Sequence, residues 1–524
     1  MIIFVKHMKN YILSFFSAIL LSLAWPVSGY SFFIFFAFVP LLYVIESISV
    51  SIENGSGKKV YLFSAITFLL FNFFTTYWVY HATMFGVVIA FLVNTFLMSS
   101  VFYLFFKSKK YFSARLSYIG LVVFWISMEF FHLNWDLSWP WLNLGNCFSE
   151  SVFLVQWYEY TGALGGSLWV LVVNILIFRV LKKPKDLKLV SLVLMVVILP
   201  IVFSFIIKSQ NNELQKESQN IVIVQPNINS YTEKFSLSYQ SQLHDFIELA
   251  KTKIDSTTDL LIGPETALVE SLWESKIEYS YSIRKLKDLQ KDFPNLSILI
   301  GATTYKAYNS IDDKSVTSRQ LRHQDIWYDA YNSAIFISKS GDLDVYHKTK
   351  LVPGAEKIPF PYLLNNISAL SVDLGGVSGS LGSDNYLNSF DMQGYSVLPL
   401  ICYESIYGDL NTSKEFDFMC VITNDGWWGN TSGYKQHFSY AKLRAIEQRR
   451  AVVRSANTGK SGVINTNGDV IAFSDWNQKT AIASIVPIGN KKTFYNTNGD
   501  YIGRISFFIS SILLLMIFVK SKVK

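Results

Sequence analysis

The apolar residues of this 524-residue chain are unevenly distributed along its length. Long apolar blocks repeat through the N-terminal two fifths, short apolar runs alternate with polar segments in the middle, and one more block precedes the C-terminus. Long blocks are typical of membrane helices, and short runs separated by polar segments are typical of a water-facing domain. We therefore expect a seven-span membrane region at 1–210, a globular domain at 216–490, and a last membrane helix with a short tail at 500–524.

Eight apolar blocks are interpreted as membrane spans, although several are shorter than the ~20 residues that a helix needs to cross the hydrocarbon core. The first block follows two lysines, as a signal peptide would, but seven similar blocks and no clear cleavage site favour a retained span. The expected spans are Tyr11–Trp25, Tyr30–Ile48, Val60–Tyr80, Met84–Phe106, Ser117–Phe131, Gly162–Leu181, Leu189–Ile207 and Ile502–Val519.

Basic residues alternate between the connections of these spans. Lysine and arginine cluster before the first span, in every second connection and after the last span. The connections between them, such as Pro26–Gly29 and His81–Thr83, contain no lysine or arginine. Because cytoplasmic loops carry the positive charge, both termini are expected in the cytoplasm. The large domain between the seventh and eighth spans would then lie on the outer side of the membrane.

Composition agrees with a membrane protein and argues against other classes. Hydrophobic residues make up 51% of the chain, charged residues only 16%, and the mean hydropathy is +0.28. The net charge of +7 needs no nucleic-acid partner, because many cationic residues lie in the inner loops. Seven histidines and three cysteines show no metal-ligand spacing, so neither a metal nor another cofactor is expected. Three cysteines on an oxidising side would leave at least one unpaired, and we expect no structural disulfide.

The middle region interleaves strand-like and helix-like segments. A pattern of this kind supports a layered α/β sandwich over an all-β domain. Asn-Thr-Asn-Gly-Asp at 465–469 predicts a hairpin turn. Strands are expected at Asn220–Val224, Asp259–Ile262, Ser297–Gly301, Asn332–Ser338, Asp344–His347, Val397–Ile401, Phe418–Thr423, Ala451–Ser455, Ser461–Ile464 and Val470–Phe473, and helices at Ser236–Lys253, Ile277–Lys291 and His437–Arg450.

Three strand ends carry residues with complementary chemistry. Leu398–Gly408 is an apolar run that ends at Cys402 and continues into a helix-compatible segment, an elbow that would expose a nucleophilic thiol. Glu265 ends Leu-Leu-Ile-Gly-Pro-Glu and could take the thiol proton. Lys348 follows another strand and could favour a thiolate or an oxyanion. A neutral residue at Lys348 should abolish activity without unfolding the domain.

Other interpretations of these residues remain open. Cys402 could be a small buried hydrophobe, which is the commoner fate of a free cysteine. A cysteine–histidine pair would use His437 or His347 as the base instead of Glu265. Position alone does not decide between the carboxylate and the imidazoles.

Aromatic side chains gather in the connection before the sixth span and after one domain strand. Trp139 and Trp141 lie in Ser-Trp-Pro-Trp-Leu, where they could form an interfacial belt or a lipid-facing platform. Trp427 and Trp428 could be hydrophobic core or a lip that contacts lipid. Glu129 is an ionisable residue at membrane depth, which makes it a functional candidate unless it reaches water.

Several motifs together carry a family resemblance. Gly-Pro-Glu, His-Lys-Thr-Lys-Leu-Val-Pro, and Cys-Tyr-Glu followed by Asn-Asp-Gly-Trp-Trp-Gly resemble the Glu–Lys–Cys signature of the nitrilase superfamily. With the spans and Ser-Trp-Pro-Trp-Leu, nearly the whole chain resembles the apolipoprotein N-acyltransferases. The resemblance implies an αββα sandwich on the periplasmic side of the bacterial inner membrane.

The resemblance also implies a reaction and a site. Glu265 would be the base, Lys348 the lysine of the triad and Cys402 the nucleophile. Cys402 would accept an acyl chain as a thioester from a phospholipid, expected to be phosphatidylethanolamine. The α-amino group of diacylglyceryl-cysteine at the N-terminus of an apolipoprotein would then take the acyl chain. The bilayer anchors both substrates, so a site that faces it exploits proximity.

Further active-site positions follow from the same resemblance. The family's additional glutamate falls on Glu356, and the residues after the nucleophile are Tyr403 and Glu404. The sequence departs from the common pattern with Gly-Ala-Glu in place of Phe-Gly-Glu, and with Glu-Phe-Phe-His at 129–132 in place of Glu-Trp-Leu-Arg. None of these changes touches the triad, so they leave the loop geometry and the acyl preference open rather than the reaction.

Two alternative functions are compatible with parts of the sequence. A membrane-tethered amidase of the same superfamily would use water in place of the amine, but would have no need for seven spans. A non-catalytic binder of lipid or lipoprotein would carry the three residues only as structure, and Cys402→Ser would leave its activity unchanged. The joint presence of Glu265, Lys348 and Cys402 argues against the binder.

Overall fold

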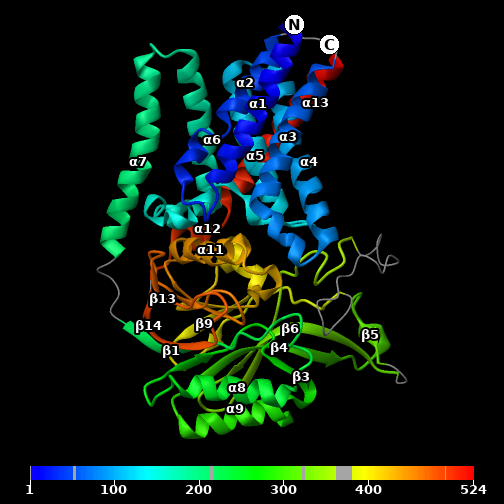
Figure 1. Ribbon diagram of the computed structural model, residues 1–524, viewed down its shortest axis with the longest axis vertical. Coiled ribbons are helices and arrows are strands. Elements are labelled where there is room, and N and C mark those ends of the chain that lie inside the picture. The colour runs from blue at the N-terminus through cyan, green and yellow to red at the C-terminus, as the bar shows by residue number, and fades with distance from the viewer. Residues whose placement is uncertain are drawn as a thin grey trace. The chain divides into compact units, whose positions relative to one another are not determined.

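Long helices form one part of the chain and two β-sheets form the other, as the computed structural model shows (Figure 1). The helical unit comprises residues 1–80, 84–210 and 497–524, and the sandwich unit comprises 81–83 and 211–496. The expected domain limits at 216 and 490 lie outside the described residues. The structure describes residues 2–50, 55–211, 217–321, 325–360, 380–489 and 491–523.

The helical unit consists mainly of apolar helices. Among the described residues, seven helical segments are long and apolar enough to cross a membrane. They correspond to the second to eighth expected spans. The apolar part of the first helix, Met8–Leu23, is shorter. The helices are α1 (Ile2–Leu23), α2 (Val39–Val50), α3 (Ser56–Thr76), α4 (Met84–Tyr111), α5 (Ala114–Leu133), α6 (Tyr158–Lys182), α7 (Leu187–Asn211) and α13 (Tyr501–Val523).

Buried polar side chains connect α3, α4 and α5. Trp135 Nε1 donates to His132 Nδ1 over 2.7 Å, so the proton of the neutral ring lies on Nε2. His132 Nε2 donates to Asn94 Oδ1 over 2.6 Å, and Asn94 Nδ2 donates to Asn72 Oδ1 over 3.0 Å. Each donor of this chain meets an acceptor, which stabilises polar groups inside an apolar bundle. His132, where the common family pattern has arginine, thus joins Trp135 to Asn94 by hydrogen bonds.

Glu129 connects α5 to the segment that follows it. The side chain is 2% exposed. Its Oε1 accepts hydrogen bonds from Trp125 Nε1 at 2.9 Å and from the Leu144 backbone N–H at 2.7 Å. The carboxylate therefore fixes the fold of this segment rather than reaching water.

The tryptophans of the same segment pack against each other. Trp141 is 1% exposed, and its ring lies 4.7 Å from Trp78 and 5.6 Å from Trp139 between ring centres. A ring so enclosed by protein has no face for lipid. The lipid contact expected of Trp141 is therefore wrong. Trp139 is partly exposed, and its expected lipid contact stays a prediction.

The sandwich unit contains two sheets. Among the described residues, the first has the order β14–β1–β2–β4–β6–β5, with β3 beside β4 and β7 beside β6, and the second has the order β13–β12–β11–β10–β9–β8. The strands are β1 (Glu217–Gln225), β2 (Leu260–Ile262), β3 (Leu268–Trp273), β4 (Ser297–Ala307), β5 (Arg319–Gln320), β6 (Trp327–Ile337), β7 (Leu343–His347), β8 (Phe390–Asp391), β9 (Ser396–Ile401), β10 (Phe418–Thr423), β11 (Ala451–Ala456), β12 (Gly462–Ile464), β13 (Val470–Phe473) and β14 (Thr480–Ile488).

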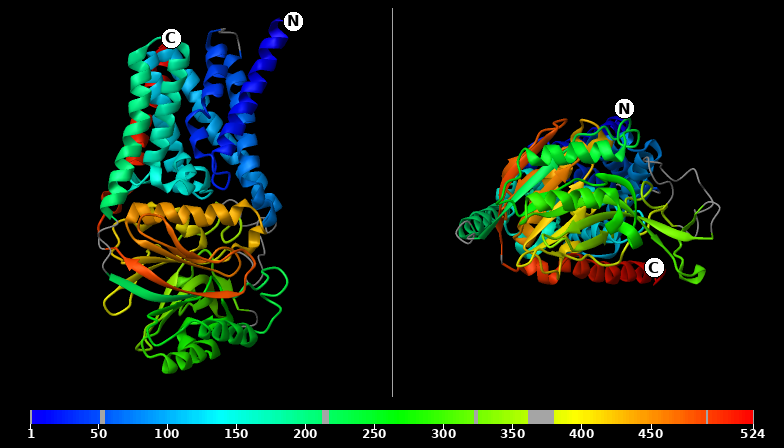
Figure 2. Two further views of the ribbon diagram at one scale, coloured as in Figure 1. Left: turned by 60° about the vertical axis from the view of Figure 1, so that its left-hand side comes forward. Right: turned by 90° about the horizontal axis from the view of Figure 1, so that it is seen from below.

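Helices cover the outer faces of both sheets. Helices α8 (Tyr239–Lys251) and α9 (Tyr281–Asp292) lie on the first sheet, and α11 (Ser432–Gln448) lies on the second (Figure 2). A short helix, α12 (Phe494–Asn498), follows β14. The layers are therefore helix, sheet, sheet and helix, which confirms the expected α/β sandwich.

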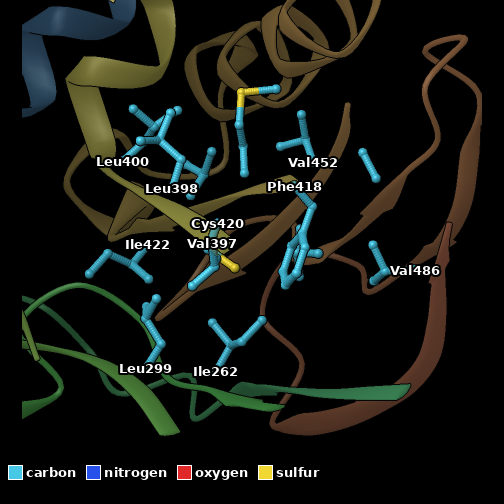
Figure 3. Packing of buried hydrophobic residues seen from close by; sticks show 14 of the residues in the cluster. Ile262, Leu299, Val397, Leu398, Leu400, Phe418, Cys420, Ile422, Val452 and Val486 are labelled. Carbon is cyan, nitrogen blue, oxygen red and sulfur yellow. The ribbon is translucent and has the colours of Figure 1, made fainter. Parts of the chain in front are cut away.

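Alternation along the strands explains why both faces are buried. Ile221 and Ile223 of β1 belong to the core that lies between the sheets and extends to α11, whereas Val222 and Val224 pack toward α8 and α9. Successive side chains of a strand point to opposite faces, so one apolar run fills two cores. Figure 3 shows Ile262 and Leu299 of the first sheet facing residues of the second.

Helix boundaries differ from the expected ones where a capping residue intervenes. The expected helix at 277–291 is a 3-10 helix, Glu274–Tyr279, followed by α9. Ser280 separates them because its hydroxyl accepts from the Ile283 N–H and caps the start of α9. The hairpin predicted at 465–469 joins β12 and β13, which pair antiparallel.

Candidate active site

Cys402 occupies the predicted strand-to-helix elbow. Strand β9 ends at Ile401, and a 3-10 helix, Cys402–Ile406, begins at the cysteine itself. The Cys402 backbone has φ of +51°, a left-handed conformation that is costly for a residue with a Cβ. Such conformations concentrate at active sites, where the surrounding structure holds them in place.

Glu265 and Lys348 form a buried ion pair. Glu265 follows β2 and Lys348 follows β7, as the sequence predicts. Lys348 is 1% exposed, and its Nζ lies 3.5 Å from Glu265 Oε1 and 2.8 Å from Glu356 Oε1. The structure therefore brings Glu265 and Glu356 together around the ammonium group of Lys348. The charges of Glu265 and Lys348 both affect the pKa of Cys402.

Further groups that the sequence did not indicate hold the two carboxylates in place. Asn332 Nδ2, from β6, donates to Glu265 Oε1 over 2.7 Å and to Glu356 Oε1 over 2.9 Å. The Asn424 N–H donates to Glu265 Oε2, and the Val352 N–H donates to Glu356 Oε2. Asn332 looked like the start of an apolar strand, and its inward direction depends on a strand register that the sequence leaves open.

Lys234 is a second buried cation next to Glu265 that the sequence did not indicate. Its Nζ donates to the Glu265 carbonyl oxygen over 3.4 Å and contacts the Thr266 hydroxyl. Burial lowers the pKa of Lys234 to about 8, although the charge of Glu265 opposes this shift. Thr266 itself has a positive φ of +47°, so the lysine supports a strained turn directly after the carboxylate.

The electrostatics of the site keep the resting thiol neutral. Burial raises the pKa of Cys402 well above its ordinary value, Glu265 raises it further, and Lys348 only partly offsets these effects. For Lys348, burial lowers the pKa, but the carboxylates of Glu356 and Glu265 outweigh it and hold the pKa above the usual range. The site thus combines a protonated thiol with a permanent ammonium, and the thiol needs a base such as Glu265 to react.

A pH profile of thiol alkylation tests this arrangement. We expect iodoacetamide to alkylate Cys402 slowly at pH 7, with a rate still rising above pH 9, because only the thiolate reacts. Glu265→Gln removes a negative charge that disfavours the thiolate, so the apparent pKa should fall in this variant. Mass spectrometry of the Cys402 peptide measures the rate. A wild-type rate that levels off below pH 8 would contradict the neutral thiol.

Glu404 fixes the loops around the site. Its Oε1 accepts from the Tyr346 hydroxyl at 2.6 Å, the Thr349 N–H at 2.6 Å and the Thr349 hydroxyl at 2.7 Å. Its Oε2 accepts from the Ile401 N–H at 2.7 Å. Glu404 thus joins the elbow to the segment that carries Lys348. Tyr403 is also buried and packs edge-to-face on Tyr407.

We expect Glu404→Gln to destabilise the protein although it changes only one atom. The Gln amide nitrogen cannot accept the hydrogen bond from the Ile401 N–H, and a buried donor without a partner costs about 1–3 kcal/mol. Chemical denaturation of the detergent-solubilised protein measures the loss. Thr257→Val, which removes a hydroxyl from an exposed turn, is the control. Equal stability of wild type and Glu404→Gln would show that the hydrogen bond from the Ile401 N–H does not contribute to stability.

The two histidines considered as alternative bases have other partners. His347 Nε2 lies 2.7 Å from Glu274 Oε1 and its Nδ1 lies 3.1 Å from Asp384 Oδ2. His437 Nε2 lies 3.1 Å from the carbonyl oxygen of Cys402, and its Nδ1 faces Asp425. Both rings thus have partners other than the thiol sulfur, and the carboxylate of Glu265 remains the better candidate base.

Two aromatic residues follow β10 near Asn424. Trp427 and Trp428 are partly exposed and belong to a 3-10 helix, Asp425–Trp428. Trp427 packs edge-to-face on Tyr231, whose hydroxyl donates to the Trp427 carbonyl oxygen. The lipid contact expected of both residues stays a prediction. The described residues hold no cluster of three or more histidine, cysteine or acidic side chains that could bind a metal.

Comparison with known proteins agrees with these motifs. Residues 221–488 match the carbon–nitrogen hydrolase family, and residues 17–176 match the N-terminal domain of apolipoprotein N-acyltransferases. A relative from Chlorobaculum tepidum, named apolipoprotein N-acyltransferase, is 27% identical over 98% of this chain and 97% of its own.

A second relative carries the same name, and a solved structure is similar to part of the chain. The apolipoprotein N-acyltransferase of Geobacter metallireducens is 23% identical over 94% of this chain and 92% of its own. Among solved structures, yeast Nit3, a member of the nitrilase superfamily, is 17% identical over 52% of this chain and 91% of its own, with a TM-score of 0.37. The chain belongs to the carbon–nitrogen hydrolase superfamily and, within it, to the apolipoprotein N-acyltransferases.

Proposed function

We propose that this enzyme transfers a fatty acyl chain from a phospholipid to the N-terminal α-amino group of diacylglyceryl-cysteine in apolipoproteins, through a thioester on Cys402. The buried pair of Glu265 and Lys348, together with the left-handed elbow at Cys402, is the observation that carries this proposal. The names of the relatives supply the substrate class.

In the first half-reaction, the Cys402 sulfur attacks the ester carbonyl of the phospholipid. Glu265 takes the thiol proton, and the ammonium of Lys348 stabilises the oxyanion that forms. The carbon–oxygen bond to the glycerol then breaks. Glu265 returns the proton to the leaving oxygen, which yields a lysophospholipid and an acyl thioester.

In the second half-reaction, the α-amino nitrogen of the apolipoprotein attacks the thioester carbonyl. Glu265 accepts a proton from the attacking nitrogen, and Lys348 again stabilises the oxyanion. The carbon–sulfur bond breaks, an amide forms, and the proton on Glu265 returns to the sulfur. The enzyme regains its resting state without any cofactor.

We further propose the setting in which the reaction takes place. The distribution of lysine and arginine supports both termini in the cytoplasm and the domain at 216–490 on the periplasmic side of the inner membrane. Phosphatidylethanolamine is the proposed donor. Glu356, Tyr403 and Glu404 support the site, and Trp139, Trp427 and Trp428 are the proposed lipid contacts.

Intact-mass measurement of the detergent-purified protein tests the mechanism. Incubation with phosphatidylethanolamine should add the mass of one acyl chain, and hydroxylamine should remove it, because thioesters are sensitive to this reagent. A diacylated lipopeptide should discharge the adduct and become triacylated. An adduct that water discharges as fast as the lipopeptide does would indicate an amidase-like hydrolase, and no adduct with any phospholipid would indicate a lipid binder.

A further inference from the structure

Three charged or titratable side chains are buried next to the Cys402 elbow. They have no part in the proposed proton transfers. Asp425 follows β10, His437 lies on α11 and Arg454 lies on β11. All three are 0% exposed. A buried ion pair is a costly feature unless its geometry is good, so its presence at this place needs an explanation.

The two terminal nitrogens of Arg454 pair with both carboxylate oxygens of Asp425. Its Nη1 donates to Asp425 Oδ2 at 2.9 Å and to the Lys460 carbonyl oxygen at 2.7 Å. Its Nη2 lies 3.0 Å from Asp425 Oδ1 and 2.7 Å from His437 Nδ1. Each terminal nitrogen has two N–H groups, so one N–H of Nη2 is available to donate to the histidine.

The contact with Cys402 determines which nitrogen of His437 carries a proton. The Cys402 carbonyl oxygen can only accept, so Nε2 is the donor. Nδ1 lies between Arg454 Nη2 at 2.7 Å and Asp425 Oδ1 at 3.0 Å. Burial and the charge of Arg454 lower the pKa of His437 below its ordinary value, which agrees with a neutral ring. The charge of Arg454 polarises the ring and strengthens the Nε2 donor.

The Nε2 donor reaches the backbone of the proposed nucleophile. It lies 3.1 Å from the Cys402 carbonyl oxygen and 2.9 Å from the Ser405 hydroxyl oxygen. The Ser405 hydroxyl donates to the same carbonyl over 2.7 Å. The carbonyl oxygen can only accept, so His437 Nε2 and the Ser405 hydroxyl both donate to it. His437 thus connects Arg454 to the backbone of Cys402.

We infer that His437, oriented by Arg454 and Asp425, is a positioning residue that holds the Cys402 peptide and thereby the direction of the thiol. The inference rests on the proposed role of Cys402 as nucleophile. The carbonyl and the next N–H of a trans peptide point in opposite directions, so fixing this carbonyl also fixes the N–H of Tyr403. The contact lies at a residue whose φ of +51° is left-handed, a conformation that an unsupported chain would avoid.

Two variants of His437 separate this role from general packing. The side-chain amide nitrogen of glutamine falls near the position of Nε2, and that of asparagine falls near Nδ1. His437→Gln therefore keeps the donor to Cys402, whereas His437→Asn keeps a partner for Arg454 and loses that donor. We expect acyl-enzyme formation to slow about 10²-fold in His437→Asn, since small misplacements of a nucleophile have effects of this size. The rate in His437→Gln should remain within about 5-fold of wild type.

The experiment measures the acylation rate by intact mass, the alkylation rate of Cys402 by iodoacetamide, and the melting temperature. Leu286→Ala, which opens a cavity in the core below α9, is a destabilised control and should acylate at the wild-type rate. Equal acylation rates in the glutamine and asparagine variants would overturn the inference. If neither variant folds, Arg454→Lys decides, because it removes the Nη2 contact that orients His437, and an unchanged acylation rate would overturn the inference.

The experiment distinguishes a failure of the positioning role of His437 from a failure of the proposed thioester mechanism. If the wild-type protein forms no acyl-enzyme, the proposed thioester mechanism is wrong. Alkylation of Cys402 still reports the position of the thiol in that case. Faster alkylation in His437→Gln than in His437→Asn would support the positioning role independently of the acyl substrate.

Discussion

Cys402→Ser should form no acyl-enzyme and should lower the rate of acyl transfer by at least about 10³-fold, since a serine hydroxyl is much less acidic than a thiol and a far weaker nucleophile. The fold should persist, because the substitution replaces one atom at a position that the surrounding contacts already hold. Intact mass after incubation with phospholipid, together with transfer to a lipopeptide, measures both effects.

Cys420→Ser is the matched control for this variant. Cys420 is a fully buried thiol in β10, so the same substitution occurs in the same unit away from the proposed site. We expect it to reduce stability because it buries a hydroxyl, but to leave the acyl adduct intact. An adduct on Cys402→Ser, or its loss in Cys420→Ser, would place the nucleophile elsewhere.

Lys348→Met should lose both activity and stability. Loss of one oxyanion donor commonly costs ~2.7–4 kcal/mol of barrier, so acylation should slow by about 10²- to 10³-fold. The sequence alone led us to expect no effect on folding. The structure shows a fully buried ammonium between Glu265 and Glu356, and removal of one partner from such a cluster costs about 3–5 kcal/mol.

A double variant separates the two effects of Lys348. Lys348→Met with Glu356→Gln removes the ammonium together with one carboxylate, so the free energy of unfolding should recover in part. Acylation should remain as slow as in the single variant, because the oxyanion donor is still absent. Chemical denaturation and the rate of acyl-adduct formation measure these quantities. Recovery of acylation in the double variant would show that Lys348 serves only the fold.

Local patterns explain why much of the fold was predictable. The apolar runs of β1 and β10 were sufficient to predict these strands. Glu265, Lys348 and Cys402 could be selected from the sequence because each lies at the end of a predicted strand. Cap positions such as Ser280 were missed because the helical period continues through them. Periodicity reports which residues are apolar, and it does not report where a backbone hydrogen bond is replaced by a side chain.

The surroundings of the site were less predictable because they depend on contacts between distant segments. Asn332 meets both carboxylates only because β6 pairs with β4 and β7 in one register. Lys234 lies in a segment without a periodic pattern, and its proximity to Glu265 arises from the turn after β1. His437 was interpreted as a possible base, whereas its contact with the Cys402 carbonyl depends on how α11 crosses the second sheet. Tertiary packing decides such pairs, and a single sequence does not record it.

The left-handed backbone of Cys402 has a consequence for how this protein can evolve. Glycine adopts that conformation at little cost, so selection for stability alone would favour glycine at the elbow. The enzyme instead keeps a side chain there and carries the conformational cost in its resting state. Mutations that stabilise the elbow by relaxing it should therefore arise easily and should reduce activity, which makes this turn a point of trade-off between stability and catalysis.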